Sequence, residues 1–331
     1  MPLFTQGHAL VIGAGGDLPG AATDAEQLAG LLADPGRCAY PPAQVAALTA
    51  AAAGRAAILA GLERLARAAD RDSTAVVYFS GHGYRVASSI GDAYFLLPHG
   101  YDLARLRETA VSGAELAGRL AAIPAGRLLV LLDCCHAGGV GEAKAPGLAF
   151  TKAPLPPEAL ALLEQGRGRV LIASSRADEL SFAGDPLSAF TLALAEALCG
   201  IGAARQDGYV RVADLALHAR EMTPQRTGDR QHPILHFEQA DNFAVAYYAA
   251  GAAQPKGLPF AAPPTIEPAP GAWRSGPAVR GDQISAAGPV ATRGSAVNTG
   301  SGVAFVGDGN VIITGAVRGD VRRTAGSTRG G

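Results

Sequence analysis

The sequence predicts an α/β fold in which a mostly parallel six-stranded sheet is flanked by helices, followed by a small β-prone C-terminal tail. Short apolar runs of strand length alternate with segments of helical period through the first 250 residues. Two of these runs stop at small residues next to a histidine or a cysteine, as strands do at the carboxyl edge of a parallel sheet. After Tyr248 the composition shifts toward proline, alanine and glycine, which indicates that the packed domain ends there.

The expected elements alternate along the chain. Apolar runs predict strands at 8–13, 45–49, 75–79, 128–132, 169–173 and 233–237. Apolar residues at helical spacing predict helices at 22–33, 55–69, 112–122, 187–199 and 211–221. Residues 137–168 are rich in glycine and proline, and 157–165 is the one short helix expected in that stretch. This alternation favours parallel strands with helices on both faces of the sheet.

Three regions are expected: a domain over residues 1–250, a linker rich in Pro, Ala and Gly over 251–280, and a glycine-rich tail over 281–331. Gly-Asp pairs recur in the tail, with β-branched runs at 303–306 and 311–314 between them. Such short runs bury little surface alone. We therefore expect them to stack in a small solenoid or to pair between chains.

Composition and charge argue against several classes of function. The formal net charge is −1 and no run of Lys or Arg forms a phosphate-binding patch, so we expect no nucleic-acid partner. The apolar stretches are too short to span a bilayer, and no signal peptide is visible, so we expect no membrane association. None of the four cysteines forms a two-residue-spaced pair, so we expect no metal site and a reducing, cytoplasmic location.

A histidine and a cysteine follow two different predicted strands. The run at 75–79 leads into Ser80-Gly81-His82-Gly83, and the run at 128–132 leads into Asp133-Cys134-Cys135-His136-Ala137-Gly138. A cysteine nucleophile needs a base that is near in space although distant in sequence. We interpret His82 as the base, Cys135 as the nucleophile, and the backbone N–H groups of Gly83 and Cys135 as the oxyanion hole. Strand alternation should point Cys134 away from Cys135, as an apolar core residue.

These segments resemble the histidine loop and the D-x-C-H-x-G cysteine loop of the caspase-like clan of cysteine peptidases, in its metacaspase and bacterial caspase-homologue branch. The resemblance extends in order over residues 7–245, through Thr23-Asp24-Ala25, Ala173-Ser174-Ser175, Ser188-Ala189-Phe190-Thr191 and Gln231-His232-Pro233-Ile234. It implies a caspase-like sandwich and an endopeptidase that acts on protein or peptide substrates without a cofactor.

The same resemblance implies that Asp24 and Asp133 bind the substrate side chain. Asp133 lies two residues before Cys135, on the same side of the strand. Two carboxylates pair with a guanidinium or an ammonium group, so cleavage after Arg or Lys is expected. Two other interpretations remain open: Asp24 at a helix N-terminus and Asp133 as a structural residue. Asp178, Glu179 and Asp185 are expected near the rim of this pocket.

Activation is expected to involve two further segments. The segment that follows the nucleophile, together with its end, offers basic cleavage points for self-processing at Lys144, Lys152, Arg167 and Arg169. The tail loosely resembles the glycine-spaced, amyloid-like signalling motifs at the ends of bacterial immune proteins. That likeness implies self-association or an activating partner, and a role in antiviral defence or cell suicide.

Two rival functions are compatible with the same residues. The chain would be a catalytically silent scaffold if it only recruited partners through its tail, although such a scaffold has no need of both Cys135 and His82. Alternatively, Cys135 would act on small esters or thioesters in a thiol hydrolase.

Overall fold

The computed structural model divides the chain into two compact units, residues 1–267 and 268–331. In the first unit it describes residues 3–86, 93–134, 150–152, 168–176, 179, 181–238, 240–249, 252 and 254–260. In the second unit it describes the strands at 283–284, 291–292, 296–298, 302–307 and 310–315. The two units are taken separately below.

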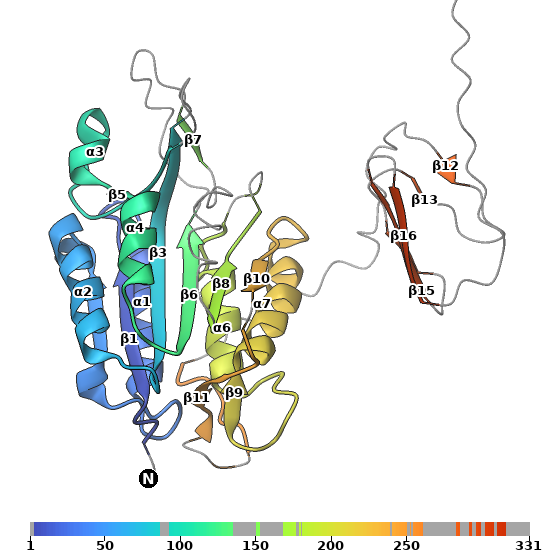
Figure 1. The fold of residues 1–331 in the computed structure, drawn as a ribbon, viewed down its shortest axis with the longest axis horizontal. Helices are drawn as coiled ribbons and strands as arrows, with labels where there is room; N and C mark the ends of the chain where they lie inside the picture. Colours follow the sequence, from blue (N-terminus) through green and yellow to red (C-terminus); the bar gives the residue numbers. More distant parts are fainter. Residues whose placement is uncertain are drawn as a thin grey trace, which may run out of the picture. The chain divides into compact units, whose positions relative to one another are not determined.

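The first unit is built on a sheet with the strand order β10-β8-β6-β3-β1-β2 (Figure 1). These strands are β1 (Gly7–Gly13), β2 (Val45–Thr49), β3 (Thr74–Val86), β6 (Arg127–Cys134), β8 (Arg169–Ala173) and β10 (Ile234–Glu238). All are parallel to their neighbours except β10, which pairs with β8 in the antiparallel sense. The predicted six-stranded, mostly parallel sheet is confirmed.

Helices cover both faces of this sheet (Figure 1). They are α1 (Pro19–Ala33), α2 (Arg55–Ala68), α3 (Leu106–Thr109), α4 (Gly113–Ala121), α6 (Ala189–Leu198) and α7 (Val212–Thr227). Alternate residues of each strand face opposite helical layers. On β1, Ala9 and Val11 pack in the core formed with α1, α6 and α7, whereas Leu10 and Ile12 pack in the core formed with α2 and α4. The continuous apolar runs of the sequence reflect this burial on both faces.

Strand β3 is much longer than predicted. We expected a strand at 75–79 and then a loop, but β3 continues to Val86. Its extension leaves the parallel sheet and pairs in the antiparallel sense with β4 (Ala93–Leu97) and β7 (Phe150–Lys152). The short strand β5 (Val111–Ser112) then pairs with β4. The prediction was wrong because the strand was taken to stop at the small residues after Phe79, whereas pairing with β4 and β7 holds this part of the chain extended.

Two helix ends also differ from the prediction. Helix α1 begins at Pro19, near the favoured first-turn position for proline, so Asp24 lies in its second turn and not in its first. Helix α7 continues through Pro224 to Thr227, beyond the expected end at 221. In this added turn, Arg226 pairs with Glu196 of α6 at 2.5 Å, which ties the two helices together. The helix expected at 157–165 lies outside the described residues.

A smaller antiparallel pair, β9 (Tyr209–Arg211) and β11 (Ala244–Tyr247), completes the first unit. Residues 254–260, which we had assigned to the linker, contact this unit. Leu258 and Phe260 pack against its core, and the Gly257 carbonyl accepts a hydrogen bond from Arg37 Nη2 at 3.1 Å.

None of the helices in the described parts of the chain has the length and apolar character needed to cross a membrane.

The described strands of the second unit pair in the antiparallel sense within the chain. They are β12 (Gln283–Ile284), β13 (Ala291–Thr292), β14 (Ala296–Asn298), β15 (Gly302–Gly307) and β16 (Asn310–Gly315). β14, β15 and β16 form one sheet in that order, and β12 pairs with β13. The two β-branched runs singled out in the sequence, 303–306 and 311–314, lie in β15 and β16.

Candidate active site

The parallel part of β3 and the strand β6 end side by side. Their parallel register pairs Ser80 with Asp133 and Gly81 with Cys134. His82 is the next residue of β3, so the two sequence motifs are delivered to the same edge of the sheet. Cys135 and His136 lie outside the described residues.

The His82 ring is buried against an acid that the sequence analysis did not single out. Its side chain is 3% exposed, and its Nε2 lies 2.7 Å from Oδ2 of Asp17, in the loop between β1 and α1. The backbone N–H of Ala14 donates to the Ser80 carbonyl at 2.8 Å and so ties this loop to β3. The only signal in the sequence was an acid placed directly after the glycines that end the first strand.

The glycines around His82 serve packing. A Cβ atom at Gly83 would overlap the Tyr94 hydroxyl and lie 3.2 Å from Cβ of Cys134. One at Gly81 would lie 2.8 Å from the Ala14 carbonyl oxygen. A side chain at either position would therefore force β3 away from its neighbours. Cys134 itself is buried in the core on the α2 and α4 side of the sheet, as predicted for an apolar core residue.

Asp24 and Asp133 meet on the opposite side of the sheet edge. Both are almost fully buried, with 1% and 0% exposure. Ser188, which caps the N-terminus of α6, links them. Its backbone N–H donates to Asp24 Oδ1 at 2.9 Å, and its hydroxyl donates to Asp133 Oδ2 at 2.5 Å. Because Asp24 lies in the second turn of α1, the alternative that it merely occupies a helix N-terminus is wrong.

Further hydroxyl groups donate hydrogen bonds to these two acids. Asp133 accepts hydrogen bonds from Ser181 Oγ at 2.5 Å and Thr191 Oγ1 at 3.3 Å. Asp24 accepts a bond from Ser80 Oγ at 3.3 Å. The sequence analysis missed Ser80, Ser181 and Ser188 as partners of these acids, because a serine carries no signal of the carboxylate that it will meet in the fold.

The charge of Asp133 disfavours ionisation of Asp24. Burial, and next the charge of Asp133, raise the pKa of Asp24 to about 7. The hydrogen bonds from Ser188 and Ser80 lower this pKa but do not compensate. Near neutral pH the Asp24 carboxyl is therefore part protonated. A cation placed beside both groups would favour the doubly ionised form.

The profile of the caspase domain, peptidase C14, matches residues 6–244 of this sequence. The chain belongs to the caspase family of cysteine peptidases. This match confirms the predicted fold, and membership of a peptidase family implies protein substrates. No curated protein sequence matches the chain significantly. A similar solved structure is that of protein GSU0716 from Geobacter sulfurreducens, with 18% identity and a TM-score of 0.49 over 76% of this chain and 99% of that chain.

In this caspase domain, Gln231 holds the loop that supplies Ser181. Its Nε2 donates to the Ser174 carbonyl at 3.0 Å and to Ser181 Oγ at 3.1 Å. Its side-chain carbonyl accepts from the Phe182 N–H at 2.9 Å. Gln231 is fully buried, so it couples the segment before β10 to the hydroxyl that binds Asp133.

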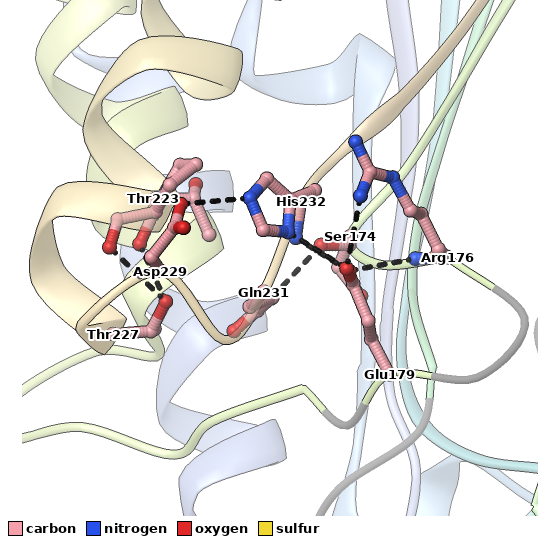
Figure 2. Close-up of polar contacts among 9 residues, drawn as sticks. Ser174, Arg176, Glu179, Thr223, Thr227, Asp229, Gln231 and His232 are labelled. Atoms are coloured by element: carbon pink, nitrogen blue, oxygen red, sulfur yellow. Dashed lines mark hydrogen bonds and ion pairs between the residues drawn. The ribbon is translucent and has the colours of Figure 1, made fainter. Parts of the chain in front are cut away.

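His232, the residue after Gln231, places its ring between the carboxylates of Asp229 and Glu179 (Figure 2). Ring Nδ1 lies 2.7 Å from Glu179 Oε1 and Nε2 lies 2.9 Å from Asp229 Oδ1, while the backbone N–H donates to Glu179 Oε2 at 2.7 Å. Glu179 also accepts from the Arg176 N–H at 3.2 Å. Glu179 thus joins two segments of the caspase domain, and its expected place near a pocket rim stays a prediction. Asp178 lies outside the described residues.

The proposed processing points have different surroundings. Lys144 and Arg167 lie outside the described residues. Lys152, which follows the nucleophile in the sequence, is part of β7. Arg169 begins β8, which pairs on one side with β6 and on the other with β10. Its guanidinium donates to the Leu120 carbonyl at 2.9 Å, near the end of α4. Cleavage after Arg169 would cut β8 at its first residue, and self-processing at this position stays a prediction.

A metal site is not evident in the part of the caspase domain that the structure describes. There, no three His, Cys, Asp or Glu side chains are grouped so that they could hold an ion.

Proposed function

We propose that this caspase-family protein is an endopeptidase that cleaves after Arg or Lys, with Cys135 as nucleophile and His82 as base. The buried pair of Asp24 and Asp133 is the observation that carries the specificity. Asp133 precedes Cys135 by two residues, and Ser188 joins it to Asp24. A basic substrate side chain bound at this pair would relieve the repulsion between its two carboxyl groups.

The proposed reaction uses the two ends of β3 and β6. A thiol of ordinary pKa, about 8.5, is only a few per cent ionised at neutral pH, so His82 must take the proton of Cys135. The thiolate then attacks the scissile carbonyl carbon, and the N–H groups of Gly83 and Cys135 stabilise the oxyanion. His82 returns the proton to the leaving amine. Water, deprotonated by His82, finally hydrolyses the thioester, and the thiol is restored.

A peptide electrophile with Arg at its terminal recognition position tests this proposal. The wild-type protein should be labelled and should hydrolyse the matching fluorogenic peptide, whereas Cys135→Ala and His82→Ala should do neither. Cys134→Ser is the matched control and should keep most activity. Labelling of Cys135→Ala would refute the nucleophile. A protein that binds partners without labelling would be a scaffold, and one that cleaves only small esters would be a thiol hydrolase.

We also propose the finer role implied by the sequence: a metacaspase-like effector of the bacterial cytoplasm in antiviral defence or cell suicide. The thiol chemistry and the buried Cys38 and Cys199 support a reducing compartment. Self-processing at Lys144, Lys152, Arg167 or Arg169 would release the segment after Cys135. Mass spectrometry of the wild type beside Cys135→Ala would detect the fragments. The tail would supply self-association or contact an activating partner.

A further inference from the structure

The contact between Asp17 and His82 makes a third residue part of the peptidase site. Asp17 is 45% exposed in its loop, yet its Oδ2 reaches the buried ring of His82 at 2.7 Å. The loop is shaped by Gly15, whose φ of +127° is rarely adopted by other residues, and by the hydrogen bond from Ala14 to Ser80. These features place the carboxylate at Nε2, beside the end of β3.

The contact determines which ring nitrogen does the chemistry. A carboxylate can only accept a hydrogen bond, so Nε2 carries the proton in the neutral ring and Nδ1 carries the lone pair. A base must present an unprotonated nitrogen to the thiol. Nδ1 is thus the nitrogen that would take the proton of Cys135. The imidazolium formed in that step is then stabilised by the carboxylate at Nε2.

We propose that Asp17 is a positioning residue of the peptidase reaction, which fixes the His82 ring and its tautomer so that Nδ1 serves Cys135. This inference rests on the proposed function, in which His82 is the base. The pair becomes a Cys-His-Asp arrangement, with Asp17 acting through His82 and without contact to the substrate.

Among the residues that the structure describes, the aromatic neighbours of His82 and Asp17 do not replace this carboxylate. The Tyr84 ring packs edge-on to the His82 ring, with 6.5 Å between the centroids. Tyr94 and Cys134 crowd the neighbouring Gly83. Burial, and then the charge of Asp17, raise the pKa of both Tyr84 and Tyr101, so these phenols stay neutral near pH 7 and the carboxylate is the charged group in this set.

Asp17→Asn tests the role with a side chain of nearly the same shape. It should lower kcat on an Arg peptide by about tenfold to a hundredfold, the effect of losing a charged hydrogen-bond partner, with little change in KM. The acid limb of the pH profile, set by protonation of the His82 base, should move to lower pH because the charge that stabilises the imidazolium is gone. Asp17→Glu should restore part of the activity. Glu26→Gln, on exposed α1 surface, is the control and should match the wild type.

NMR titration of the His82 imidazole, assigned by comparison with His82→Gln, separates this inference from the peptidase proposal. A titration that moves to lower pH in Asp17→Asn shows that Asp17 acts on His82, even if the wild type cleaves no peptide and the proposed function fails. Unchanged titration together with unchanged kcat in Asp17→Asn would overturn the inference. A loss of kcat with unchanged titration and no recovery in Asp17→Glu would also overturn it, because it would indicate a merely structural loop residue.

Discussion

Asp24 and Asp133 come from different elements, helix α1 and the end of β6, and Ser188 donates one hydrogen bond to each of them. The N-terminus of α6 thus faces both acids, which favours negative charge there. The stabilisation is incomplete, because burial and the charge of Asp133 still raise the pKa of Asp24 to about 7. A fold that brings two acids together without a cation is less stable than the same fold with the cation bound.

The first prediction concerns substrate specificity. Asp24→Asn or Asp133→Asn should each lower kcat/KM for an Arg peptide by roughly tenfold to a hundredfold, because one charged hydrogen-bond partner is lost. A peptide with citrulline, the neutral analogue of arginine, should lose much less. The ratio of the two rates measures the effect on charge recognition, and Glu26→Gln serves as the acidic control on exposed surface. A wild type that prefers Asp or a large apolar residue would contradict this pocket.

A second prediction is a pH dependence of the same ratio. Ionisation of Asp24, with a pKa of about 7, should raise kcat/KM for the Arg peptide over the citrulline peptide as the pH rises from about 6 to 8. The ratio cancels the titrations of Cys135 and His82, which affect both peptides. In Asp24→Asn the rise should disappear. An identical rise in that variant would assign the titration to another group.

As part of the same prediction, the stability of the fold should show the opposite trend with pH. The pKa of Asp24 is raised on folding from 3.8 to about 7, so its contribution is fully present below about pH 4 and is lost as the pH rises through 7. Asp24→Asn does not titrate. The free energy of unfolding of Asp24→Asn, relative to that of the wild type, should therefore increase by about 2 kcal/mol between pH 5 and pH 8, as measured by urea unfolding. A constant difference would mean that Asp24 ionises as easily in the fold as in the unfolded chain.

The order of elements could be predicted because strands buried on both faces leave continuous apolar runs. Leu10 and Ile12 face one helical layer while Ala9 and Val11 face the other, and no polar residue interrupts the run. The placement of His82 at the sheet edge followed from the same pattern. The extension of β3 was not predicted, since β4, its nearby antiparallel partner, was not recognised as a strand and its other partner, β7, lies more than sixty residues further along the chain.

The partners of the site residues were the least predictable part. Asp17 reaches His82 only because a glycine-shaped loop and one backbone hydrogen bond direct it there. The position of Asp24 in α1 was misjudged because Pro19 was not used as a start signal for the helix. The burial of the acid pair depends on α6, which follows Asp133 by more than fifty residues. Local patterns do not carry such information.

Gln231 offers a third prediction. Gln231→Leu removes three buried hydrogen bonds and leaves their partners unsatisfied, so it should cost about 3 kcal/mol or more of unfolding free energy. The variant should also lower the ratio of kcat/KM for the Arg peptide to kcat/KM for the citrulline peptide, since Ser181 loses the hydrogen bond from Gln231. Gln231→Asn, which keeps an amide and places no charge in this buried site, provides a milder variant if the first does not fold. Gln44→Leu removes bonds to the Thr5 and Gly7 carbonyls and should leave the ratio unchanged.

A fourth prediction concerns the tail. Truncation before Trp273 should leave the hydrolysis of small peptides nearly unchanged, because the proposed catalytic residues lie in the other unit. It should reduce self-association, or activation by a partner, because short strands need a second surface to be stable. Sedimentation of the Cys135→Ala protein with and without the tail measures the first effect while avoiding self-cleavage. If the truncated and the full-length protein sediment alike and are activated alike by a partner, the hypothesis is wrong.

The last prediction tests why glycine is needed beside His82. Gly83→Ala places a methyl group against the Tyr94 hydroxyl and Cys134, so it should destabilise the fold by about 1–3 kcal/mol and reduce activity. Tyr94→Phe removes the closest atom, so the double variant should regain part of the lost stability, a coupling that a thermodynamic cycle measures. Gly118→Ala is the matched control: nothing lies within 4 Å of its added Cβ on exposed α4, and it should stabilise by about 0.5–1 kcal/mol. Equal losses in Gly83→Ala and the double variant would show that the hydroxyl of Tyr94 is not what excludes a side chain at this position.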